Sequence, residues 1–120
     1  MSRHIKIVRL TPFDMRCIEE AILYVDKHYE SNISADQLAI EVSLSKGKLQ
    51  AGFQQKTKLT LHKYIWQVRL EKAKKLLVTT NEPVKKIAAV TGFYDESHFC
   101  KVFKRLTTIS PVEYRLQQAI

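Results

Sequence analysis

The sequence predicts an all-α fold of about seven helices, and three observations support this prediction. Apolar residues recur every three or four positions through most of the 120-residue chain, which is the period of a helix with one buried face. Residues that favour helix starts precede these stretches repeatedly. The one strand-like stretch, residues 5–10, has no partner strand with which to pair.

The composition is that of a basic globular chain. Lys and Arg number 20 against 12 Asp and Glu, which gives a net charge of +8 and a pI of about 9.6 and suggests a polyanionic partner.

Cys17 and Cys100 lie far apart on helical patterns, so we expect free thiols in a reducing compartment. The four histidines lack metal-ligand spacing, and we expect no metal or cofactor. No apolar run approaches the roughly 18 residues that span a membrane, and no signal-peptide core is present. A cytoplasmic, nucleoid-associated protein is therefore expected.

The chain begins with a basic stretch that has no helical period. We interpret residues 1–12 as an N-terminal arm or linker. The first helix is expected to begin near Asp14 and to end at Tyr29, because apolar residues recur between them at helical spacing.

Two short helices are predicted next, with a turn between them. Ser34, which is followed three residues later by a glutamine, is typical of a capping box at the start of the second helix. Ser45 caps the third helix, whose inward residues are Leu49 and Phe53. Gly52 weakens this helix by about 1 kcal/mol relative to alanine, and it would also let a neighbouring helix approach closely.

A long helix is predicted over residues 61–78, and its apolar face shifts partway along, so it could serve two cores. Pro83 suits the first turn of a fifth helix. Asp95 caps a sixth helix that extends to about residue 106. Ser110 and Pro111 begin a final helix that runs to about residue 118.

The chain contains two similar units. Leu49 and Phe53 match Phe99 and Phe103 fifty residues later, and each pair follows a short helix and a turn, which is the helix-turn-helix arrangement. We therefore expect a first helix-turn-helix subdomain over residues 13–60, a connecting helix over 61–78 and a second subdomain over 79–120. The alternative is a plain seven-helix bundle in which both units are only core.

The outward faces of the third and sixth predicted helices carry side chains that hydrogen-bond base edges or phosphates. These residues are Lys46, Lys48, Gln50 and Gln54 in the first unit, and Ser97, His98, Lys101, Lys104 and Arg105 in the second. Gln50 is the strong base-edge candidate, and the lysines are candidate phosphate contacts, with guanine also open to Lys101 and Lys104. The alternatives are an ordinary solvated face and, for His98, packing on its own helix.

The connecting helix has a length that suits two DNA contacts. About 17 residues make a helix of about 26 Å. Successive major-groove entries on one face of B-DNA are about 34 Å apart, and the flanking turns could supply the difference.

These segments resemble the DNA-binding domain of the AraC/XylS family of bacterial transcription regulators. The resemblance covers residues 18–115 and is carried by residues 33–53, 64–77, 87–93, 99–104 and 110–115. It implies an all-helical, homeodomain-like pair of helix-turn-helix subdomains. It also implies promoter binding through the third and sixth helices in adjacent major grooves, most often to activate transcription.

The resemblance further implies which positions read bases. They are Gly47, Gln50 and Ala51 in the first unit, and Glu96, Ser97, Cys100 and Lys101 in the second. Gly47 and Ala51 stand where larger side chains are common in the family, so we expect the first unit mainly to hold phosphates. Lys58 and Thr108 stand where glycine usually ends a helix.

Other classes of function find less support. No Gly-rich phosphate loop, paired carboxylates or metal-protease motif indicates an enzyme. A protein-interaction module is the second class, in which the basic face docks an acidic partner such as part of RNA polymerase. One protein can belong to both classes, because a DNA-binding activator must also contact the polymerase. Family members often carry an N-terminal effector-binding domain, which this sequence does not show.

Overall fold

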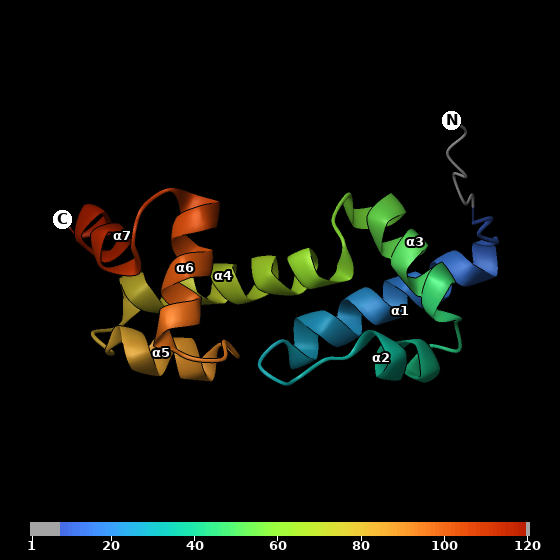
Figure 1. Ribbon diagram of the computed structural model, residues 1–120, viewed down its shortest axis with the longest axis horizontal. Helices are drawn as coiled ribbons and strands as arrows, with labels where there is room; N and C mark the ends of the chain where they lie inside the picture. Colours follow the sequence, from blue (N-terminus) through green and yellow to red (C-terminus); the bar gives the residue numbers. More distant parts are fainter. Residues whose placement is uncertain (1–7, 120) are drawn as a thin grey trace, which may run out of the picture. The chain divides into compact units, whose positions relative to one another are not determined.

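The computed structural model describes residues 8–119, which form seven helices and no strand. The helices are α1 (Pro12–His28), α2 (Ala35–Glu41), α3 (Lys46–Thr57), α4 (Leu61–Thr79), α5 (Val84–Val90), α6 (Glu96–Thr107) and α7 (Pro111–Gln118) (Figure 1). The all-α prediction is confirmed. Half of the strand-like stretch, residues 5–7, lies outside the described residues.

The helices form two compact units. The first unit comprises the chain up to Lys27 together with Ile33–Tyr64, and the second comprises His28–Asn32 together with the chain from Ile65 onward. The first turn of α4 therefore belongs to the first unit, and the rest of this helix belongs to the second.

Helix α1 begins at Pro12, two residues earlier than predicted. The Thr11 hydroxyl accepts a hydrogen bond from the Asp14 N–H at 3.0 Å, and the Asp14 carboxylate accepts one from the Thr11 N–H at 2.9 Å. This reciprocal pair is a capping box in which aspartate takes the place of the usual glutamate or glutamine. Pro12 fits the first turn because its missing N–H would have no partner there.

The core of the first unit lies between α1, α2 and α3. Its fully buried members are Ile18, Ala21, Val25, Leu38, Leu49 and Phe53. The predicted caps are confirmed, because Ser34 accepts from the Gln37 N–H at 3.0 Å and Ser45 accepts from the Lys48 N–H at 3.2 Å. The close approach predicted at Gly52 is also confirmed, since a Cβ atom there would overlap Cγ1 and Cδ1 of Ile18.

The core of the second unit is an apolar cluster from α4, α5, α6 and the turn between α5 and α6. Its members are Leu70, Ala73, Leu77, Ile87, Ala88, Phe93, Phe99, Val102 and Phe103. Asp95 caps α6 by accepting from the His98 N–H at 2.7 Å, and Ser110 caps α7 by accepting from the Glu113 N–H at 3.1 Å. Pro83 is the N-cap of α5 and not a first-turn residue, so that prediction was wrong by one position. A proline at either place spares the helix an N–H without a partner.

Gly92 makes the turn between α5 and α6, and two conditions require a glycine there. Its φ of 93° lies in the left-handed region. A Cβ atom would also lie 2.9 Å from Arg69 Nε, from Glu30 Cα and from Tyr29 O. Arg69 holds this neighbouring segment, since its Nε donates to Tyr29 O at 2.6 Å and its Nη2 donates to Ser31 O at 2.8 Å.

The ends of α3 and α6 are built alike. Lys58 and Thr108 are left-handed C-caps with φ of 65° and 72°, a conformation in which glycine is the usual residue at a helix end. The hydroxyls of Thr57 and Thr107 each donate to the carbonyl four residues earlier, at 2.6 and 2.7 Å. The same backbone path is therefore followed in both units without a glycine.

The aromatic packing behind each of these helices is also repeated. The rings of Phe53 and Tyr64 meet edge to face at 5.5 Å, and those of Phe103 and Tyr114 do so at 5.6 Å. The offset of fifty residues thus continues beyond the residues on which the sequence match was based. It places each position of α3 in register with one position of α6.

Candidate nucleic-acid interface

The predicted contact residues of α3 lie on its outer face, because Leu49 and Phe53 occupy the inner one. Lys46, Gly47, Gln50 and Gln54 are exposed, and Lys48 and Ala51 are half-buried. A Cβ atom at Gly47 would meet no atom within 4 Å. Packing within this unit therefore does not require a glycine at that position.

Both lysines at the start of α3 have carboxylate partners. Lys46 Nζ lies 3.4 Å from Asp36 Oδ1, and Lys48 Nζ lies 3.1 Å from Asp14 Oδ2. The hydrogen bond from the Thr11 N–H, with a smaller contribution from Lys48, holds the pKa of Asp14 below its ordinary value although desolvation opposes the shift. Lys48 thus connects the start of α3 to the start of α1.

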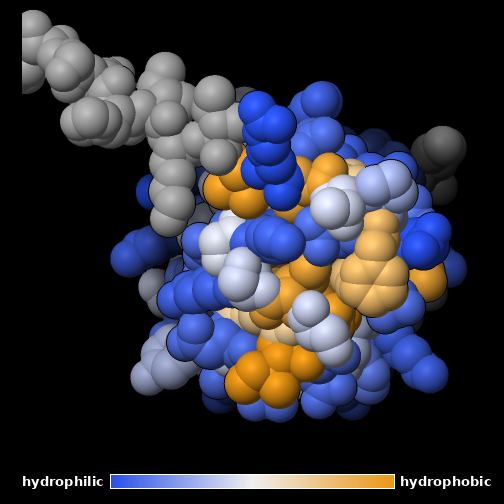
Figure 2. Space-filling model, turned by 90° about the vertical axis from the view of Figure 1, so that its right-hand side faces the viewer, coloured by the Kyte–Doolittle hydropathy of each residue, from blue (hydrophilic) through white to orange (hydrophobic). Residues whose placement is uncertain are grey.

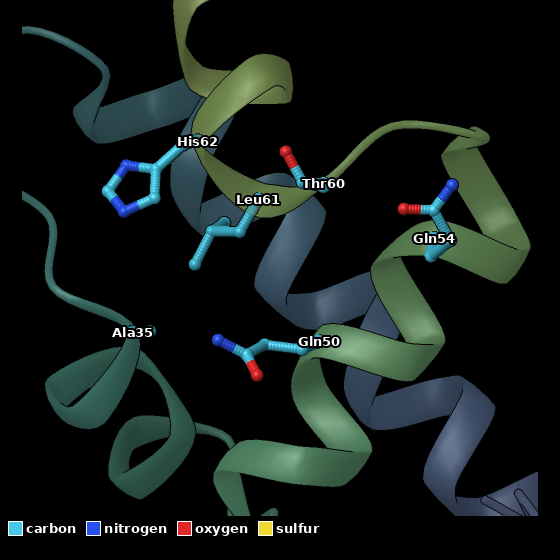
Figure 3. A pocket seen from close by; sticks show the side chains of 6 residues that line it. All are labelled: Ala35, Gln50, Gln54, Thr60, Leu61 and His62. Atoms are coloured by element: carbon cyan, nitrogen blue, oxygen red, sulfur yellow. The ribbon is translucent and has the colours of Figure 1, made fainter. Parts of the chain in front are cut away.

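A pocket of about 320 Å³ adjoins the outer face of α3 (Figure 3). Gln50 and Gln54 line it from α3, Thr60 lines it from the turn before α4, and Leu61 and His62 line it from the first turn of α4. In Figure 3 the Gln50 carboxamide extends away from α3 into this space. Thr60 and His62 were missed by the sequence reasoning, because periodicity within one helix does not show which residues of another helix border the same face.

The outer face of α6 differs from that of α3 in having cations without a carboxylate partner among the described residues. Glu96, Ser97, Lys101, Lys104 and Arg105 are exposed. Within residues 8–119, no carboxylate lies within ion-pair distance of Lys101, Lys104 or Arg105. These three cations are thus open to an external anion.

His98 and Cys100 are half-buried and lie at the edge of the core. The His98 ring packs against Trp66 and Phe93, each at a centroid distance of 6.0 Å, and its Nδ1 is buried without a hydrogen-bond partner among the described residues. Burial, with a contribution from Glu96, raises the pKa of the Cys100 thiol. Cys100 therefore presents a neutral, weakly reactive thiol and not a thiolate.

Two kinds of feature are absent from the described residues. Residues 8–119 contain no cluster of three His, Cys, Asp or Glu side chains able to hold a metal ion. Over the same range, no helix is both long enough and apolar enough to cross a lipid bilayer.

Figure 2 shows one face of the first unit, on which hydrophobic side chains appear in separate areas with hydrophilic ones between them. The exposed large apolar residues of this unit are Phe13, Leu23 and Ile40.

Two units, each with a short helix, a tight turn and a second helix with an exposed polar face, define the class of helix-turn-helix domains. The sequence pattern of a family described as a helix-turn-helix domain matches residues 38–117. The chain belongs to this family, in its AraC-type branch.

Individual relatives agree with this assignment. The probable transcriptional regulator LumQ of Photobacterium leiognathi is 30% identical over 92 residues, which are 77% of this chain and 37% of LumQ. The C-terminal domain of AraT, a response regulator from Geobacillus stearothermophilus, has a TM-score of 0.82 at 26% identity, with 94% of this chain and 91% of that chain covered. A transcriptional regulator with an AraC-type DNA-binding domain from Chromobacterium violaceum has a TM-score of 0.81 at 28% identity, with coverage of 91% and 97%. The chain spans between 24% and 58% of the length of the first curated relatives.

Proposed function

We propose that this chain binds double-stranded promoter DNA in a sequence-specific manner and regulates transcription. The observation that carries the proposal is the duplicated helix-turn-helix, with polar and cationic side chains on the outer faces of both α3 and α6. Such side chains bind base edges and phosphates in major grooves. The net charge of +8 supports a polyanionic partner.

The proposed mode of binding places α3 and α6 in adjacent major grooves. The 19 residues of α4, at about 1.5 Å each, give a helix of about 28 Å, against about 34 Å between successive grooves. The turns at the two ends of α4 supply the remainder.

We further propose that the regulator acts in the cytoplasm at the nucleoid, is an activator that contacts RNA polymerase, and has no catalytic activity.

A DNA titration at several salt concentrations tests this function. If six phosphates are neutralised, the logarithm of the association constant falls with the logarithm of salt concentration at a slope of about −5. A slope near zero, or binding only to an acidic protein, contradicts DNA binding and favours the protein-interaction alternative.

Selection of bound sequences from a random DNA pool then tests specificity. A single enriched motif with two half-sites about one helical turn apart supports two-groove binding. A motif confined to one half-site contradicts the two-groove mode but not DNA binding itself.

A further inference from the structure

We propose that the two units contribute unequally to DNA binding: α3 reads adenine through its carboxamides, and α6 supplies the free cations that bind phosphate. This inference rests on the proposed function and concerns how the same surface divides its tasks. It reverses the expectation from the sequence that the first unit mainly holds phosphates.

The register between the two helices makes a position-by-position comparison possible. The caps at Ser45 and Asp95 and the left-handed residues Lys58 and Thr108 both lie fifty positions apart. Outer positions of α3 and α6 can therefore be paired in the same way. Lys46 pairs with Glu96, Gly47 with Ser97, Gln50 with Cys100, Ala51 with Lys101, Gln54 with Lys104 and Gln55 with Arg105.

The cations of the two helices differ in what they already contact. Lys46 and Lys48 lie 3.4 and 3.1 Å from carboxylates, so a phosphate must compete with an existing ion pair. Within residues 8–119, Lys101 and Lys104 have no such partner. A free ammonium group gives up only water and counterions when it binds phosphate.

The middle of the outer face of α3 is neutral. Gln50 is exposed, donates or accepts no hydrogen bond among the described residues, and borders the pocket of Figure 3. Gln54 makes only a long bond of 3.4 Å to the Lys58 carbonyl. A glutamine carboxamide matches the N6 donor and N7 acceptor of adenine in the major groove. The equivalent position in α6 holds Cys100, which cannot make that pair of hydrogen bonds.

Reciprocal exchange at one pair of equivalent positions tests the assignment of phosphate binding. The salt dependence of binding to the selected site is measured by fluorescence anisotropy for the full chain. Lys104→Gln should reduce the steepness of the slope by about 0.9, and Gln54→Lys should increase it by about 0.9. Lys46→Met is the comparison, and it should flatten the slope less than Lys104→Gln does, because a phosphate at Lys46 must compete with Asp36, whose Oδ1 lies 3.4 Å from the ammonium group.

A second measurement tests base reading. Gln50→Ala should reduce discrimination between the selected site and random DNA by about 5- to 140-fold, without changing the salt slope. Cys100→Ala, at the equivalent position in α6, should change neither the discrimination between sites nor the salt slope. Replacing the contacted adenine by 7-deazaadenine, which lacks the N7 acceptor, should weaken binding of the unchanged protein but not of Gln50→Ala.

Three results would overturn the division of tasks. The first is a slope that flattens as much for Lys46→Met as for Lys104→Gln. The second is an equal loss of affinity on all sequences for Gln50→Ala. The third is a 7-deazaadenine effect that persists in Gln50→Ala. If the unchanged protein does not bind DNA at all, the proposed function fails first, so the two failures are distinguishable.

Discussion

Two glycines five residues apart in α3 should respond in opposite ways to the same substitution. A methyl group at Gly52 would overlap Cγ1 and Cδ1 of Ile18, a residue that is completely buried. A methyl group at Gly47 would enter open space. Because Gly→Ala restricts the unfolded chain similarly at both sites, the difference between the two variants reports the overlap with Ile18.

The magnitudes follow from two opposing effects. Alanine in place of glycine within a helix raises the free energy of unfolding by about 0.5–1 kcal/mol. Adding a methyl group to a close-packed core costs about 1–3 kcal/mol. Gly47→Ala should therefore raise the free energy of unfolding by up to about 1 kcal/mol, and Gly52→Ala should lower it by about 1–2 kcal/mol.

Urea unfolding followed by circular dichroism measures both free energies. Ile18→Val removes the Cδ1 atom, so Gly52→Ala should cost less in that background than in the unchanged protein. If Gly52→Ala is as stable as Gly47→Ala, or if the Ile18→Val background makes no difference, close packing of α1 on α3 is not what requires Gly52.

Three further predictions concern single residues. Lys58→Gly and Thr108→Gly should each raise the free energy of unfolding by about 0.5–1 kcal/mol, because glycine adopts a positive φ without strain; an unchanged or lower urea midpoint contradicts this. Asp95→Ala should lower thermal stability by about 1 kcal/mol through loss of the α6 cap, while Asp95→Asn should retain most of it. The pKa of Asp14 is lowered from its ordinary value of 3.8, so its stabilisation is fully present above about pH 4 and is lost as the pH falls through the lowered value. Asp14→Asn should remove this part of the acid dependence, which urea midpoints measured between pH 2 and pH 6 would show.

Local signals in the sequence were sufficient to predict most of the helices. Ser34, Ser45, Asp95 and Ser110 each cap the helix that they were expected to cap, because the cap and its partner lie within three residues of each other. The start of α1 was misplaced because a capping box closed by aspartate is a weaker sequence signal than one closed by glutamate.

The candidate site was less accessible to sequence reasoning, because its environment depends on tertiary contacts. The partner of Lys48 is Asp14, more than thirty residues earlier, and no periodicity within α3 indicates it. The same holds for Thr60 and His62, which border the outer face of α3 from the turn before α4 and from α4 itself. Which outer positions contact DNA stays a prediction.

The short segment His28–Asn32 belongs to the second unit, although the first unit contains the residues on both sides of it in the sequence. A fragment beginning at Leu61 would keep both helices of the second helix-turn-helix. It would nevertheless lose the backbone of Tyr29 and Glu30, which lies against Gly92. It would also lose the carbonyls of Tyr29 and Ser31, to which Arg69 donates hydrogen bonds. Deletions or insertions between α1 and α2 should therefore destabilise the second unit. The two halves are thus not interchangeable modules that can be separated and recombined at α4.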